Sequence, residues 1–164
     1  MTTDQGTSST APALLSTADR AEIAELAHRY AAAVDERRIQ DVVALFTEDC
    51  ALISPAPPQH MGPTTEVRGH AGVAEAMAQL GALQATVHAI TGSVIDPGAD
   101  ADTAVGRVSC FAHHVMEVRE EPLDVVWAVT YRDQYRRTEA GWRFVQRSMS
   151  VTFLEHRALK AVAG

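Results

Sequence analysis

The chain has 164 residues, of which 46% are hydrophobic and 21% charged, a composition typical of a single globular domain. Its formal net charge of -7 argues against binding to nucleic acids or anionic membranes, because an acidic surface repels phosphate groups. The cysteines Cys50 and Cys110 form no CxxC pair, and no segment reaches the roughly 18 apolar residues of a membrane-spanning helix. We therefore expect a cytoplasmic protein without a zinc ribbon or a redox dithiol.

The first part of the chain predicts helices. Residues 1–15 are rich in small polar residues, and we interpret them as a disordered leader. Ser16 or Thr17 can cap the helix that follows, and apolar side chains then recur at helical spacing. This apolar stripe consists of Ile23, Leu26, Ala27, Tyr30, Ala33 and Val34. A second, short helix is predicted over 42–46 and a strand over 50–54.

A proline-rich segment and a third helix come next. Residues 55–65 contain four prolines and predict a loop at the rim of a site. A short strand is predicted around Val67. The helix after it would bury Val73, Met77 and Leu80 on one face.

The second half of the chain predicts strands, because the apolar period changes from about 3.6 residues to about 2. The predicted strands cover 86–95, 104–119, 123–137 and 142–155. Helices followed by a long antiparallel meander indicate an α+β fold, in which a curved antiparallel sheet wraps over three N-terminal helices and encloses a pocket. One domain would span 16–157, followed by a tail, 158–164.

No nucleotide-binding, metal-binding or nucleophile motif is present, so we expect neither a cofactor nor a metal. The candidate site residues are polar side chains within apolar segments. Asp35 ends the helical stripe and could enter a pocket, or belong to a solvated cluster with Glu36. His88 interrupts a strand and could act as a general acid or base, or be a core histidine bonded to a carbonyl.

Two further candidates lie in the later strands. His113 and His114 are adjacent, so a strand points them to opposite faces and only one can enter a pocket. His113 shares its face with polar residues such as Arg107, which fits a pocket or solvent, and we favour it as the pocket histidine. Arg147 is in phase with apolar residues and needs a partner, because an unpaired buried guanidinium is costly. That partner could be Asp35, a substrate oxyanion or an acid at a subunit interface.

From residue 18 to about 155 the chain resembles the SnoaL-like branch of the nuclear-transport-factor-two-like (NTF2-like) superfamily. The resemblance is carried by the segments 30–35 (YAAAVD), 41–49 (DVVALFTED), 67–70 (VRGH), 110–114 (CFAHH) and 141–147 (GWRFVQR). It implies a cone-shaped NTF2-like barrel. That fold serves dehydratases, isomerases, cyclases, epoxide hydrolases and non-catalytic binding modules, so it does not by itself define an activity.

Within this family, the site positions are most similar to those of cofactor-independent dehydratases of the scytalone and bile-acid types. The resemblance implies that His88 is the base and Asp35 its partner, with Tyr30 and His113 on the electrophilic side. As substrate-binding residues we expect Arg147, Tyr131 and Phe46.

The sequence therefore predicts a lyase or isomerase of the dehydratase type, acting by His/Asp general acid–base catalysis on a hydrophobic cyclic substrate such as a steroid or polyketide. A homodimer or homotrimer is expected. One alternative is an epoxide hydrolase or polyketide cyclase, using Asp35, Arg147 and a second acid such as Asp133. Another is a non-catalytic small-molecule-binding module, favoured if Asp35 and His88 lie more than about 6 Å apart, too far to pair.

Overall fold

The computed structural model describes residues 14–162. Along the chain the elements are α1 (Thr17–Asp35), α2 (Ile39–Ala44), β1 (Phe46–Ala56), β2 (His60–Arg68), α3 (Gly69–Gln79), the short 3-10 helix η1 (Leu80–Ala82), β3 (Ala85–Pro97), β4 (Thr103–Val118), β5 (Glu121–Thr138) and β6 (Gly141–Ala158). No helix in this part of the chain is long and apolar enough to span a membrane.

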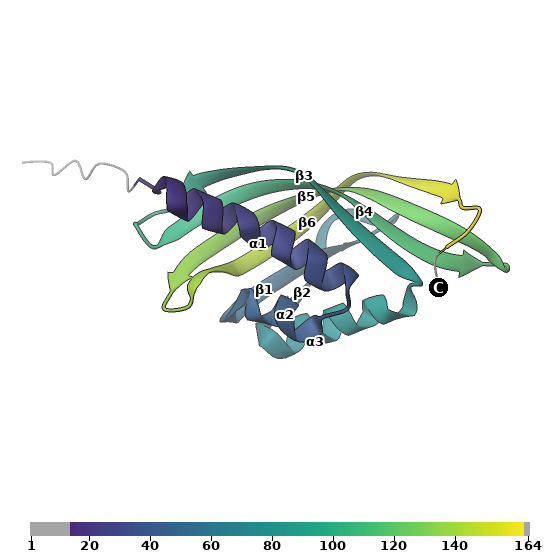
Figure 1. Cartoon of the computed structure of the whole chain (residues 1–164), viewed down its shortest axis with the longest axis horizontal. Coiled ribbons are helices and arrows are strands. Elements are labelled where there is room, and N and C mark those ends of the chain that lie inside the picture. Colours follow the sequence, from purple (N-terminus) through teal and green to yellow (C-terminus); the bar gives the residue numbers. More distant parts are fainter. Residues whose placement is uncertain (1–13, 163–164) are drawn as a thin grey trace, which may run out of the picture.

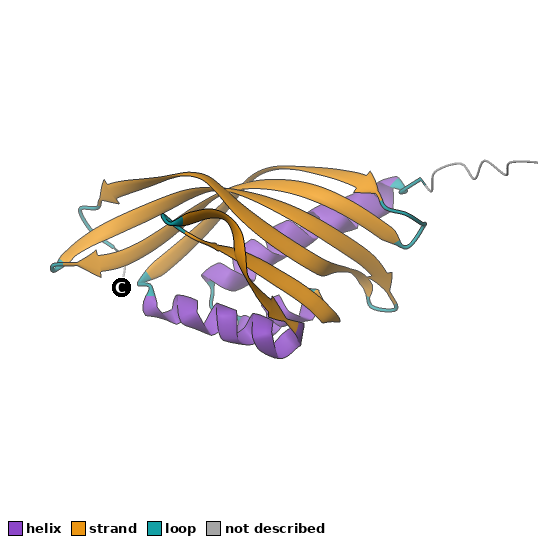
Figure 2. Cartoon of the chain, turned by 180° about the vertical axis from the view of Figure 1, so that it is seen from behind, coloured by secondary structure: helices purple, strands orange, loops and turns teal. Residues whose placement is uncertain are grey.

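Within the described residues, six strands form one curved sheet in the order β2-β1-β6-β5-β4-β3. The neighbouring strands are antiparallel except β1 and β6, which run parallel. The edge strands β2 and β3 do not pair, so the sheet does not close. Figure 1 shows α1 lying along the long strands, with α2 and α3 beside β1 and β2, and Figure 2 shows the same layers from behind. The predicted α+β class is confirmed.

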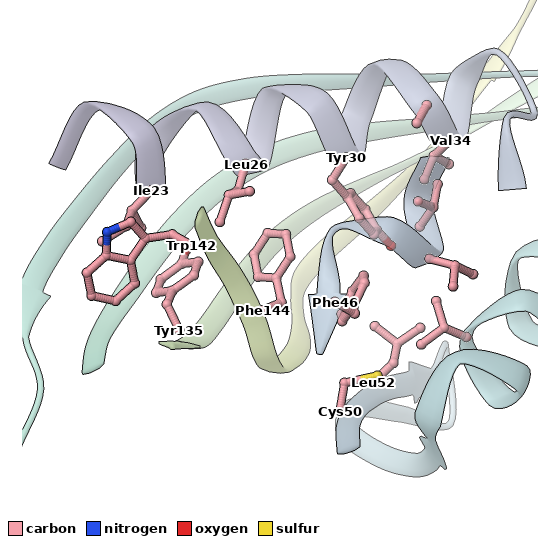
Figure 3. Packing of buried hydrophobic residues seen from close by; sticks show 14 of the residues in the cluster. Ile23, Leu26, Tyr30, Val34, Phe46, Cys50, Leu52, Tyr135, Trp142 and Phe144 are labelled. Carbon is pink, nitrogen blue, oxygen red and sulfur yellow. The ribbon is translucent and has the colours of Figure 1, made fainter. Parts of the chain in front are cut away.

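The core lies between α1 and the inner face of the sheet. Ile23, Leu26 and Tyr30 face the sheet from α1, and Trp142 and Phe144 of β6 meet them (Figure 3). Each of these side chains is at most 4% exposed, so each contributes roughly 1.5–3 kcal/mol of hydrophobic stabilisation. This packing holds one end of α1 against β6 and leaves its other end, at Asp35, beside β3.

The start of α1 is fixed by polar contacts as well as by packing. Ser16 caps the helix by accepting a hydrogen bond from the backbone N–H of Asp19 at 3.0 Å. The Asp19 carboxylate also accepts a hydrogen bond from Nε1 of Trp142. Leu15 packs in the core, although the sequence predicts it in the disordered leader. The rest of that predicted leader, residues 1–13, lies outside the described residues.

Two predicted boundaries are wrong around the first hairpin. The second helix ends at Ala44, and Phe46 begins β1, where it pairs with Phe144. The predicted loop 55–65 is mostly strand, because β1 continues to Ala56 and β2 begins at His60. Prolines are tolerated there because β2 is an edge strand and because the register shifts at Pro55, so few ladder hydrogen bonds are lost.

Candidate active site

Asp35 and His88 form a hydrogen-bonded pair at the junction of α1 and β3. Oδ1 of Asp35 accepts from Nδ1 of His88 at 2.7 Å, and Oδ2 accepts from the His88 backbone N–H at 2.8 Å. Burial alone would raise the pKa of Asp35, but the two His88 hydrogen bonds outweigh it, and the pKa lies below its ordinary value. Because the carboxylate holds the proton of Nδ1, the neutral ring carries its lone pair on Nε2. The pair therefore has the arrangement of an oriented base.

A second layer of contacts supports this pair. The residue Arg37 lies just beyond α1 with φ of 60°, in the left-handed region that is uncommon outside glycine. Its Nη1 donates to Oγ1 of Thr86 at 2.6 Å and to the carbonyl of Val34 at 2.9 Å. The Thr86 hydroxyl in turn helps to lower the pKa of Asp35. Arg37 and Thr86 thus orient the carboxylate that orients His88.

His88 opens onto a cavity of about 400 Å³ between α1, α3 and the inner face of the sheet. A volume of this order suits a small organic ligand. Most of the lining is apolar, including Met77, Leu80, Leu83, Met116, Val129 and Met149. Tyr30 and Tyr131 also line it. The cavity therefore combines one polar corner with walls that favour hydrophobic molecules.

His114, not His113, is the second histidine of the cavity. Its ring centroid lies 6.1 Å from that of His88, and the two rings are nearly perpendicular. Burial lowers the pKa of His114, which keeps its imidazole neutral near pH 7. Its Nδ1 lies 3.1 Å from the carbonyl of Val125. A carbonyl only accepts, so Nδ1 carries the proton and Nε2 carries the lone pair.

The prediction that His113 enters the pocket is wrong. His113 lies on the outer face of the sheet, where its Nδ1 contacts Oδ2 of Asp124 at 2.7 Å. The reason is the alternation of β4: positions such as Cys110 and Ala112 are buried, so His114 follows them inward. Oδ1 of Asp124 is buried without a partner among the described residues. His113 is therefore remote from the proposed chemistry.

Arg147 is completely buried and pairs with Asp133, directly opposite it across β5 and β6. Its Nε and Nη2 donate to the two carboxylate oxygens at 3.0 and 2.9 Å. The guanidinium also lies 4.4 Å from the ring centroid of Tyr30 and 4.1 Å from that of Tyr131. Neither Arg147 nor Asp133 lines the cavity, so the expectation that Arg147 contacts substrate is not met.

The aromatic candidates divide between the cavity and the core. Tyr30 and Tyr131 line the cavity, and burial raises the pKa of both, so their hydroxyls stay protonated. Phe46 is 2% exposed, packs between Tyr30 and Phe144 and does not line the cavity. Its predicted contact with substrate is replaced by a role in the core (Figure 3).

The chain matches the family model of the SnoaL-like domain over residues 16–148. It belongs to the SnoaL-like family, a branch of the NTF2-like superfamily. A comparison with curated proteins gave no match. Among residues 14–162 of this SnoaL-like chain, no group of three or more His, Cys, Asp and Glu side chains is placed to hold a metal ion.

Solved structures of similar proteins cover nearly the whole chain. A candidate aromatic ring hydroxylase from Novosphingobium aromaticivorans is 26% identical, with a TM-score of 0.74, over 89% of this chain and 96% of that one. A candidate scytalone dehydratase from the same organism is 22% identical, with a TM-score of 0.72, over 88% and 91%. Hexachlorocyclohexane dehydrochlorinase from Novosphingobium barchaimii is 15% identical, with a TM-score of 0.69, over 88% and 92%. The similarities to the dehydratase and the dehydrochlorinase, both below 25% identity, establish the fold alone.

Sequence reasoning missed several residues of the SnoaL-like site. His114 could have been found from strand parity, since its face of β4 is uniformly apolar and the face of His113 carries Arg107. Arg37 and Thr86 lie 49 residues apart in the chain, and no local sequence pattern predicts their contact. Trp127 lines the cavity against His114, at 4.6 Å between ring centroids. Trp127 lies in β5, and which side of β5 faces the cavity could be assigned only once the arrangement of the sheet was known.

Proposed function

We propose that this SnoaL-like protein is a cofactor-independent lyase of the dehydratase type, acting on a hydrophobic cyclic substrate such as a steroid or polyketide. One observation carries the proposal: a partly buried His88–Asp35 pair whose free Nε2 opens onto an apolar cavity. General bases in enzymes are typically held in this way, with a carboxylate that fixes the tautomer and stabilises the imidazolium. The candidate dehydratase among the similar structures is consistent with the proposal.

In the proposed reaction, Nε2 of His88 removes a proton from the carbon next to a substrate carbonyl. The C–H electron pair becomes the new C=C bond, and the C–O bond to the β-hydroxyl breaks, its electron pair leaving with oxygen. The proton held by His88 passes to that oxygen, which departs as water and restores the neutral imidazole. Asp35 stabilises the charged ring between these two transfers.

Tyr30 is the proposed electrophilic group of this reaction. It lines the same cavity as His88, and its raised pKa keeps the hydroxyl protonated. A protonated hydroxyl can donate to the carbonyl oxygen as negative charge develops on it. Tyr131, in the facing strand, lines the same wall and is a proposed substrate contact.

The alternatives receive less support from the geometry. An epoxide hydrolase with an Asp–Arg–Asp arrangement would need Arg147 and Asp133 in the cavity, whereas both are buried and paired with each other. A non-catalytic binding module would not need Asp35 and His88 to pair, and their side chains meet at 2.7 Å. Isomerisation uses the same base and returns the proton to another carbon, so it stays open within the proposal.

The proposal is tested by assaying cyclic β-hydroxy ketones of steroid and decalin type for loss of water. His88→Ala should reduce the rate by at least about 100-fold with the fold intact. His113→Ala is the matched control, because His113 has the same 2.7 Å contact to an aspartate but lies outside the cavity. An unchanged rate in His88→Ala would refute the mechanism. Conversion of a substrate to an isomer, without loss of water, would identify the reaction as isomerisation by the same base.

We also propose that a second copy of this chain covers the outer face of the sheet. Ala89, Phe111, Ala128 and Phe153 lie side by side across β3, β4, β5 and β6. The two phenylalanines are 40% and 49% exposed. A second copy presents the same apolar row, so a symmetric contact would bury both rows at once.

A further inference from the structure

The two cavity histidines present the same kind of atom to a ligand. Nδ1 of His88 is bound to a carboxylate oxygen and Nδ1 of His114 to a backbone carbonyl, and both partners only accept hydrogen bonds. In each neutral ring the proton is therefore on Nδ1 and the lone pair on Nε2. Among the described residues, the hydrogen bonds of both rings are made through Nδ1 and none is made through Nε2. The polar corner of the cavity thus contains two hydrogen-bond acceptors.

His114 is fixed in this state by its surroundings. The carbonyl of Val125 holds one side of the ring, and Trp127 packs against it at 4.6 Å between centroids. Burial disfavours the charged form, as the lowered pKa of His114 reflects. A ring flip would lose the contact to Val125 and leave that carbonyl without this donor. His114 therefore acts on a ligand as an acceptor.

The rest of the lining carries no charge. Among the cavity-lining residues that the structure describes, none is Asp, Glu, Lys or Arg. The guanidinium of Arg147 lies over the rings of Tyr30 and Tyr131, but it is fully buried and paired with Asp133. A ligand carboxylate or phosphate would have to leave water without an opposite charge to receive it, which is costly.

We infer that the cavity selects an uncharged cyclic ligand that donates a hydroxyl hydrogen bond to Nε2 of His114. This inference deepens the proposed function and rests on it in one respect. It assumes that His88 acts on the reacting carbon, so that His114 is the histidine that binds the hydroxyl. A ketone or an ether offers His114 a second acceptor and leaves the lone pair of Nε2 unsatisfied in an apolar site. A hydroxyl satisfies it. His114 is thus a substrate-binding residue that sets the chemical class of the ligand.

The experiment measures binding, not turnover, with saturated probes of one shape. These are decahydro-2-naphthol, its methyl ether, the corresponding ketone 2-decalone, and decahydronaphthalene-2-carboxylate at pH 7.5. None carries an aromatic chromophore, so a change in tryptophan fluorescence, with Trp127 in the cavity lining, reports binding. The alcohol should bind about tenfold more tightly than the ether, the ketone or the carboxylate.

Variants assign that preference to one residue. In His114→Phe the alcohol and the ether should bind within about twofold of each other. His113→Phe is the matched control on the outer face and should keep the preference, as should His88→Ala. Because His114→Phe could disturb packing, the wild-type protein provides a second readout. Its ¹⁵N NMR spectrum should show Nε2 of His114 unprotonated and shifted by the alcohol but not by the ether.

Three outcomes would overturn the inference. The first is equal binding of the alcohol and the ether by the wild-type protein. The second is a preference that survives in folded His114→Phe or disappears in His88→Ala. The third is an Nε2 that is protonated in the free protein. Loss of turnover in His88→Ala is a separate measurement, so either the function or the ligand class can fail alone.

Discussion

Arg37 and Thr86 lie 49 residues apart in the chain, and the guanidinium of one donates to the hydroxyl of the other at 2.6 Å. That hydroxyl also helps to lower the pKa of Asp35. The contact joins the end of α1 to the start of β3 behind His88. The orientation of the candidate base therefore depends on residues that do not line the cavity.

Replacing Thr86 with Val should raise the pKa of Asp35 toward its ordinary value, because the hydroxyl that helps to lower that pKa is removed. If ionised Asp35 supports His88, the acidic limb of the rate–pH profile should then move to higher pH. Carboxylate ¹³C NMR titration measures the pKa directly. Thr91→Val, at an exposed position of the same strand, is the control and should leave it unchanged. An unaltered Asp35 titration in Thr86→Val would show that the hydroxyl has no such role.

Asp133→Asn should destabilise the protein by roughly 3–5 kcal/mol, because the buried guanidinium of Arg147 would lose its counter-charge. The double variant Arg147→Met, Asp133→Leu should recover much of this loss, since no unpaired charge then remains buried. Urea denaturation measures both. A loss below about 1 kcal/mol in Asp133→Asn would indicate that water reaches the pair.

Protonation of His114 should oppose folding. Its pKa is lowered in the folded state, so between that value and the unfolded value of about 6.5 the unfolded chain binds more protons. The contribution of neutral His114 to stability is therefore complete above about pH 6.5 and decreases as the pH falls toward the folded pKa. As the pH is lowered below about 6.5, the free energy of unfolding should fall more steeply in the wild type than in His114→Phe. Parallel curves would contradict a buried, neutral His114.

The outer row of the sheet should govern self-association. Phe111→Ser combined with Phe153→Ser should convert a dimer or trimer to the monomer, because it removes the two large apolar side chains of the row. Light scattering after size-exclusion chromatography measures the mass. Val105→Ser, an exposed apolar position further along β4, is the control. A wild-type protein that is monomeric at high concentration would refute the interface.

The positions of the main helices and long strands could be predicted because they depend on local patterns. The apolar spacing from Ile23 to Val34 places α1, and the change of period after Ala85 places the long strands. Predictions failed where local patterns conflict with position in the sheet. The prolines near His60 suggest a loop, but an edge strand accommodates them.

For the site, the sequence by itself determined which residue types were available: a helix-borne Asp35, strand histidines and tyrosines, and no motif for a metal or nucleotide. Only the tertiary structure decided which of them meet. It pairs Asp35 with His88 and Arg147 with Asp133, and it turns His114 inward and His113 outward. The physical reason is that pairing across a sheet and packing of a helix on it join residues far apart in the chain, and a shift of one residue in a strand reverses every side chain.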